Sequence, residues 1–97
     1  MTEEELLVGV TDALTAYQWR WSHIRRSDKA QMMGHAGVPD IIAARHGRVL
    51  LVELKSDKGA LSNDQLEWWA QLPHSSYQLT ALVLRPAGYD AFLETIR

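Results

Sequence analysis

The sequence predicts an α/β protein in which helices cover both faces of a β-sheet. Three observations predict this class. An apolar stripe of helical period lies near the start, two apolar runs suited to strands lie on either side of His46-Gly47, and a Ser-x-x-Gln capping motif opens a later helix. With 97 residues, the chain has the size of one small domain with a single core, which we take to span 1–97.

The first helix is expected over residues 3–17. Thr2 is suited to cap its N-terminus, and three acidic residues lie in the first turn, where the helix dipole favours them. The stripe expected to face the core consists of Leu7, Val10, Leu14 and Tyr17. One turn further back, this stripe reaches Glu3 and not Glu4 or Glu5.

The later elements follow from alternation, caps and helix breakers. We expect four strands, at residues 18–24, 40–44, 49–54 and 77–84. The motif Ser62-Asn63-Asp64-Gln65 opens a helix that runs to about Leu72, and residues 90–97 form a short last helix. The central strands are apolar on both faces, as in a sheet covered on both sides. The expected order is therefore αβββαβα.

Composition and charge restrict the setting and the partners. The chain has no cysteine, which excludes disulfides and thiolate metal sites and fits a reducing cytoplasm. No apolar run approaches the roughly 20 residues of a membrane span, and the acidic start is unlike a signal peptide. We therefore expect a cytoplasmic protein without a membrane partner. The net charge is −2, yet residues 20–48 hold six basic and two acidic residues, which suits either phosphate contacts or a solvated loop.

The hairpin register brings charged residues together. If His46-Gly47 forms a two-residue turn, Asp40 lies opposite Glu53, and Lys55 follows on the same face. Two carboxylates this close repel each other unless a proton or a cation intervenes, and Mg²⁺ binds one or two carboxylates together with water and phosphate oxygens. For Glu53 and Lys55 alone an ion pair is the commoner explanation, but a second carboxylate favours a site. A slip of one residue would pair Asp40 with Leu54 instead.

The segment from Gly37 to Trp69, GVPDIIAARHGRVLLVELKSDKGALSNDQLEWW, resembles the VRR-NUC branch of the PD-(D/E)xK nucleases. The resemblance consists of Gly-x-Pro-Asp before the hairpin, Glu-x-Lys at its end, a glycine, and a Ser-x-x-Gln that opens a helix with an aromatic residue. Here these are Gly37-Val38-Pro39-Asp40, Glu53-Leu54-Lys55, Gly59, Ser62-Asn63-Asp64-Gln65 and Trp69 or Trp68. Each motif alone is weak, whereas the set in this order is specific. The chain looks like the short stand-alone form common in bacteriophages.

This resemblance implies a restriction-endonuclease-like core, with a mixed four-stranded sheet flanked by helices. It also implies a metal-dependent phosphodiesterase. By position, Asp40 and Glu53 would bind the metal together with the backbone carbonyl of Leu54. Lys55 would position or activate the attacking water.

Other positions are less specific. The family has a glutamate in its first helix, for which the apolar stripe selects Glu3 and leaves Glu5 as the alternative. Gln65 would orient Lys55 or the substrate, or would only cap its helix. His23 is equally suited to packing and to a phosphate contact, and the four tryptophans are suited to a core, an interface or stacking on bases.

The resemblance implies a Mg²⁺- or Mn²⁺-dependent DNA endonuclease, with no organic cofactor. We expect it to act on branched DNA, as a Holliday-junction resolvase does, in phage replication, recombination or repair within the host-cell cytoplasm. A nicking, flap or restriction-like nuclease is the alternative, and a catalytically silent DNA-binding module is the alternative from another class. A symmetric homodimer would supply two sites, with Trp68, Trp69 or a sheet edge at the contact. Expected DNA contacts are Arg25, Arg26, Lys29 and Lys58.

Overall fold

The structure is a computed structural model that describes residues 1–24, 33–74 and 76–97. Within these ranges the elements are α1 (Glu3–Ala16), β1 (Arg20–His23), β2 (Ile41–Arg45), β3 (Arg48–Leu54), α2 (Asn63–Gln71), β4 (Leu79–Leu84), a 3₁₀ turn η1 (Pro86–Gly88) and α3 (Tyr89–Ile96). The predicted order αβββαβα is confirmed, with the 3₁₀ turn added before the last helix.

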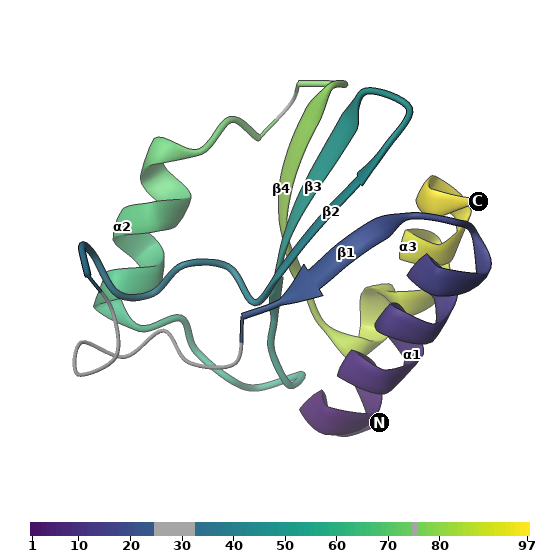
Figure 1. The fold of residues 1–97 in the computed structure, drawn as a ribbon. Coiled ribbons are helices and arrows are strands. Elements are labelled where there is room, and N and C mark those ends of the chain that lie inside the picture. The colour runs from purple at the N-terminus through teal and green to yellow at the C-terminus, as the bar shows by residue number, and fades with distance from the viewer. Residues whose placement is uncertain (25–32, 75) are drawn as a thin grey trace.

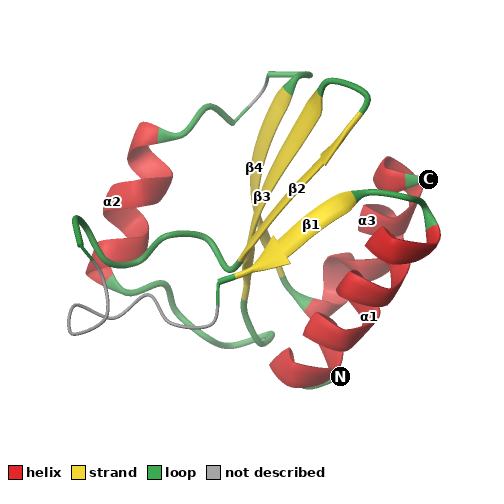
Figure 2. Cartoon of the chain, in the orientation of Figure 1, coloured by secondary structure: helices red, strands yellow, loops and turns green. Residues whose placement is uncertain are grey.

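The described strands form a four-stranded mixed sheet in the order β1-β2-β3-β4. β1 and β2 pair antiparallel, as do β2 and β3, whereas β4 runs parallel to β3. The helices lie on both faces of the sheet: α1 and α3 pack together on one face and α2 lies on the other (Figure 1, Figure 2). The predicted α/β class and mixed sheet are therefore confirmed.

The main core lies between the sheet and the α1–α3 layer. Alternate residues of β3 (Leu50, Val52 and Leu54) are buried on this face, as the period of two in a strand requires. They pack with buried residues of the two helices, namely Leu6, Val10, Leu14, Phe92 and Ile96. Each fully buried side chain of this size contributes about 1.5–3 kcal/mol to folding.

Coverage by α2 on the opposite face is incomplete. No residue of α2 is buried. On the sheet below it, Ile42 keeps 43 % of its surface exposed, and on the helix Leu66 keeps 47 %. The expectation of a sheet covered on both sides is thus fully met only on the α1–α3 face.

The first helix begins as predicted but ends differently. Thr2 caps α1, and its hydroxyl and the Glu5 carboxylate form a reciprocal capping box. The helix ends at Ala16, so Tyr17 is 37 % exposed and its predicted place in the core is wrong. The chain reverses at Gln18, which has a φ of 66°, and buries Trp19 instead. The Trp19 indole N–H donates to the carbonyl of Ile96 at 2.8 Å, which ties β1 to the end of α3.

The β2–β3 hairpin has the predicted register. Arg45 pairs with Arg48, and Ile41 pairs with Val52. Both turn residues have positive φ, 49° at His46 and 82° at Gly47, as in the type I′ turn that suits the twist of a hairpin. The same register extended by one residue places Asp40, which directly precedes β2, opposite Glu53.

Candidate active site

Asp40 ties together the ends of three strands. Its backbone carbonyl accepts a hydrogen bond from the N–H of Ile24, directly after β1, at 2.7 Å. Its carboxylate Oδ2 accepts one from the N–H of Leu54, the last residue of β3, also at 2.7 Å. These bonds hold the half-buried carboxylate of Asp40 at the edge where β2 begins and β3 ends.

Glu53 is the buried charged side chain of this site. It is 6 % exposed, and it is the one polar or charged residue among those described that is buried. Its Oε1 accepts a hydrogen bond from the side-chain amide of Gln65, whereas its Oε2 is buried and has no partner within the described residues. A carboxylate in this state is costly to keep charged.

The pKa of Glu53 is raised to about 7. Burial is the largest cause, because it disfavours the charged form, and the neighbouring carboxylate of Asp40 is the second. The positive charge of Lys55 and the backbone N–H of Asp40 act in the opposite direction, and Glu3 adds a smaller repulsion. The charges predicted to gather here therefore do influence one another.

Lys55 follows β3, and a clamp holds the turn after it. The Lys55 N–H donates to the carbonyl of Leu84 at 3.0 Å, which continues the pairing with β4. In the next turn, Arg85 Nη1 donates to the carbonyls of Ser56 at 2.6 Å and Gly59 at 2.7 Å. Sequence reasoning missed Arg85. Its place directly after the last predicted strand is the signal that could have identified it.

The first helix also reaches the site. An open pocket of about 290 Å³ is lined by Glu3, Glu4, Leu7, His23, Asp40 and Leu54. Glu3 thus lies beside Asp40, as the helical stripe predicts, but Glu4 lines the pocket too. The carboxylate of Glu5 instead binds the N–H of Thr2 at 2.9 Å, and its bonds to Thr2 lower its pKa. His23, for which packing and a ligand contact were both open, faces the same pocket.

Gln65 has two contacts. Its backbone N–H and side-chain oxygen complete the predicted capping box with Ser62. Its side-chain N–H₂ reaches Glu53, so Gln65 contacts a carboxylate of the site rather than Lys55. The helix N-terminus of α2 therefore holds Glu53 in place.

A search of solved structures finds the same architecture. One solved chain, described as a "VRR_NUC domain", aligns with a TM-score of 0.70, covers 97 % of each chain, and has 15 % sequence identity. The 97-residue protein therefore has the fold of a VRR_NUC domain. The resemblance noted in residues 37–69 is thereby confirmed at the level of the fold. No model of a protein family matches the sequence, and no curated protein matches it.

Within the VRR_NUC fold of this chain, the donors at the site suit a hard divalent cation. The described residues contain no group of three or more His, Cys, Asp or Glu that could hold a metal ion. Mg²⁺, however, takes one or two carboxylates and fills its other positions with waters and phosphate oxygens. Asp40 and Glu53 provide two carboxylates, and the unpartnered buried Oε2 of Glu53 is an oxygen that a cation would satisfy. The residues present therefore fit such an ion.

The predicted DNA-contacting residues are divided. Lys58 lies exposed in the turn between β3 and α2 of the VRR_NUC fold, close in sequence to Lys55. Arg25, Arg26 and Lys29 lie outside the described residues.

Proposed function

We propose that the chain is a divalent-metal-dependent endonuclease that hydrolyses phosphodiester bonds in DNA. The observation that carries the proposal is the buried carboxylate of Glu53, which lies beside Asp40 with one oxygen unpartnered among the described residues. A residue with only a structural task at this position would be apolar, because burying an unpaired charge costs several kcal/mol. The cost is offset if the site works with a cation bound.

The roles of the residues follow from their positions. Asp40 and Glu53 would hold Mg²⁺ or Mn²⁺, with the Leu54 carbonyl as the third protein ligand. When bound, such an ion supplies positive charge to the phosphate and makes a water molecule more acidic. Lys55 orients the attacking water, and the Gln65 amide fixes the direction of the Glu53 carboxylate.

Glu3, which lines the same pocket as Asp40, would contribute a further carboxylate. The catalytically silent DNA-binding module is disfavoured by the same residues. Phosphate binding needs positive charge, whereas the carboxylates of Glu3 and Asp40 line one pocket and Asp40 also raises the pKa of the neighbouring Glu53. Carboxylates so close together repel the phosphates of DNA unless a bound cation neutralises them.

The substrate proposed for the site is branched DNA, cut by a symmetric homodimer. Two copies related by a two-fold axis would present two sites to a junction whose strands are themselves related by symmetry. Exposed apolar residues on the incompletely covered face, Ile42 and Leu66, give such a dimer a surface to bury. Trp69 stacks on His74 of its own chain with ring centroids 4.1 Å apart, and the Trp68 indole bonds to His35 of its own chain, which favours a sheet edge for the contact. None of the described helices has the length and hydropathy needed to cross a membrane.

A cleavage panel tests this proposal. Four-way junction, flap, nicked, single-stranded and linear duplex DNA are incubated with the protein in Mg²⁺, Mn²⁺ or EDTA. We expect cleavage only with a divalent ion, and a loss of about 10²- to 10⁴-fold in Asp40→Asn, Glu53→Gln and Lys55→Ala. Glu94→Gln, on an exposed turn of α3, is the matched control and should cut at the wild-type rate.

The panel also separates the alternatives. Preference for four-way junctions supports the branched-DNA substrate, while preference for nicked, flap or linear DNA moves the assignment to a nuclease of that kind. No cleavage under any condition, or equal rates in the wild type and Glu53→Gln, would refute a nuclease that acts through this site.

A further inference from the structure

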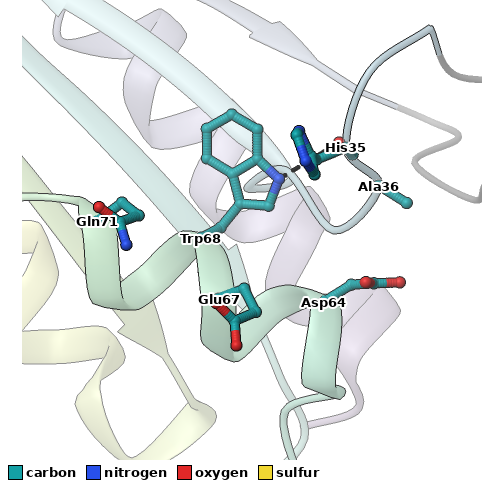
Figure 3. A pocket seen from close by; sticks show the side chains of 6 residues that line it. All are labelled: His35, Ala36, Asp64, Glu67, Trp68 and Gln71. Carbon is teal, nitrogen blue, oxygen red and sulfur yellow. Dashed lines mark hydrogen bonds between the residues drawn. The ribbon is translucent and has the colours of Figure 1, made fainter.

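A second pocket lies between α2 and the loop at residues 33–37. Its volume is about 360 Å³, and its lining consists of His35, Ala36, Asp64, Glu67, Trp68 and Gln71. None of these residues lines the pocket at Asp40. The indole N–H of Trp68 donates to the carbonyl of His35 at 3.3 Å, so the ring is held as a wall of the pocket (Figure 3).

The two charged residues of the lining, Asp64 and Glu67, are hydrogen-bond acceptors and lie on the helical turn before the indole (Figure 3). The side chains of His35 and Gln71 can donate as well as accept. No lysine or arginine is among the described residues that line the pocket. A phosphate would be repelled here. The lining instead suits a flat group that carries N–H donors, and the bases of nucleic acids combine a flat face with amino and imino N–H groups.

The segments that form this pocket also lead to or contact the site carboxylates, Asp40 and Glu53. On α2, Asp64 and Trp68 lie on either side of Gln65, whose amide holds Glu53. On the loop, Gly37 passes so close to α2 that an added Cβ would lie 2.6 Å from the backbone carbonyl carbon of Asp64. This loop leads within three residues to Asp40. The same two segments therefore form the second pocket and position both carboxylates.

We propose that this pocket receives one unpaired nucleobase of the substrate, stacked on Trp68 with its amino group directed at Asp64 or Glu67. The proposal rests on the nuclease function proposed above and names the feature of DNA that the site selects. A base within a duplex is stacked on both faces and paired, so it enters such a pocket only after unstacking, at a cost of a few kcal/mol. A nucleotide that is already unpaired avoids this cost. Within branched DNA, the favoured substrate is therefore one with an unpaired nucleotide at the branch, next to the phosphate that is cut.

Binding to two matched oligonucleotides tests the pocket without relying on cleavage. One is a short single strand with normal bases, and the other has the same length and charge but carries abasic sites throughout. In EDTA, the wild-type protein should bind the first more tightly. Trp68→Leu should weaken this binding by about 5- to 100-fold, the range of stacking on one aromatic side chain, and should leave abasic binding unchanged. Tyr77→Leu removes an aromatic residue that is 78 % exposed at the far end of the sheet, and should change neither.

A second variant guards against misfolding of Trp68→Leu, which is checked by circular dichroism. Glu67→Lys, at an exposed position of the lining, removes an acceptor for the base and adds charge for phosphates. It should tighten abasic binding and reduce the advantage of normal bases. Equal effects of either variant on both oligonucleotides would overturn the base pocket.

The failures of the two proposals are distinguishable. If the wild type cuts DNA with Mg²⁺ or Mn²⁺ but Trp68→Leu keeps the wild-type preference for normal bases, the base pocket is wrong and the nuclease stands. If no DNA is cut but Trp68→Leu loses the preference, the pocket binds bases and the nuclease assignment is wrong.

An arginine of a second copy would also suit the pocket. In that case Trp68→Leu would shift sedimentation toward the monomer without changing base-dependent binding, which would overturn the proposal.

Discussion

Replacing Glu53 with glutamine should change how the stability of the metal-free protein depends on pH. In the folded protein the Glu53 carboxyl keeps its proton up to a pKa of about 7, whereas its ordinary value is 4.5. Between these values the folded state binds more protons than the unfolded state, so the free energy of unfolding of the wild type falls as pH rises through this window. The loss is complete above about pH 7. Glutamine does not titrate, so Glu53→Gln does not undergo this loss of stability.

The expected size follows from the shift and from the contacts. A change in pKa from 4.5 to about 7 corresponds to about 3 kcal/mol. Against this, glutamine places an N–H₂ donor where Glu53 Oε2 now lies buried without a described partner, which costs about 1 kcal/mol at every pH. Glu53→Gln should therefore be less stable than the wild type by about 1 kcal/mol near pH 4.5 and more stable by about 2 kcal/mol near pH 8.

Urea or thermal unfolding in EDTA, followed by circular dichroism from about pH 4.5 to pH 8, measures this crossing. In a domain of this size, about 2 kcal/mol shifts Tm by roughly 8–16 °C. Glu94→Gln, whose carboxylate is exposed, should follow the wild type at every pH. Saturating Mg²⁺ should stabilise the wild type at pH 8 and leave Glu53→Gln unchanged. If the free energies of unfolding of the wild type and Glu53→Gln changed in parallel with pH, the pKa of the Glu53 carboxyl would not be raised in the folded protein.

Four further outcomes are expected. Gly37→Ala should lower the free energy of unfolding by about 3 kcal/mol or more. The reason is that Gly37 has a φ of 88° and an added Cβ would lie 2.6 Å from the backbone of Asp64. An unchanged midpoint of urea denaturation would contradict this close approach. Glu3→Gln should reduce cleavage, whereas Glu5→Ala should instead lower Tm through loss of the helix cap, and the opposite pattern would remove α1 from the site. Arg85→Met should lower the cleavage rate more than DNA affinity, because the guanidinium holds the turn after Lys55 and not the DNA; an affinity loss alone would refute this. Sedimentation of the wild type at micromolar concentration should show twice the mass of one chain, and a monomer that resolves junctions would exclude the dimer.

Local signals in the sequence were sufficient for much of the fold and for the pair of carboxylates. The two-residue turn at His46 and Gly47 determines the hairpin register, and that register alone places Asp40 opposite Glu53. Likewise, the capping residues of α1 and α2 were identifiable because each cap is completed within four residues. Interactions of such short range are readable from a single chain.

Contacts between distant segments were not predictable in the same way. The positive φ of Gln18 belongs to a local helix cap, in which the Trp19 N–H donates to the Leu14 carbonyl at 2.8 Å. That Trp19 rather than Tyr17 fills the core depends on a distant contact, the bond from its indole to the carbonyl of Ile96 in α3. The bond from Gln65 to Glu53 depends on where α2 lies over the sheet, and the Arg85 clamp requires the parallel pairing of β3 with β4. Hydrophobic periodicity and helix-capping motifs carry no information on such contacts between distant segments.

The hairpin turn of β2 and β3 gives a place to attach a spectroscopic probe. The turn is exposed, and a Cβ added at Gly47 would meet nothing within 4 Å. Because the chain has no cysteine, His46→Cys would create a single thiol for a dye or spin label. β2 has five residues, so this thiol lies six residues, or roughly 20 Å, along the chain from Asp40. In a two-fold pair of chains, labels at this position would report one distance, and its change when DNA is added would record how the two copies move around the substrate.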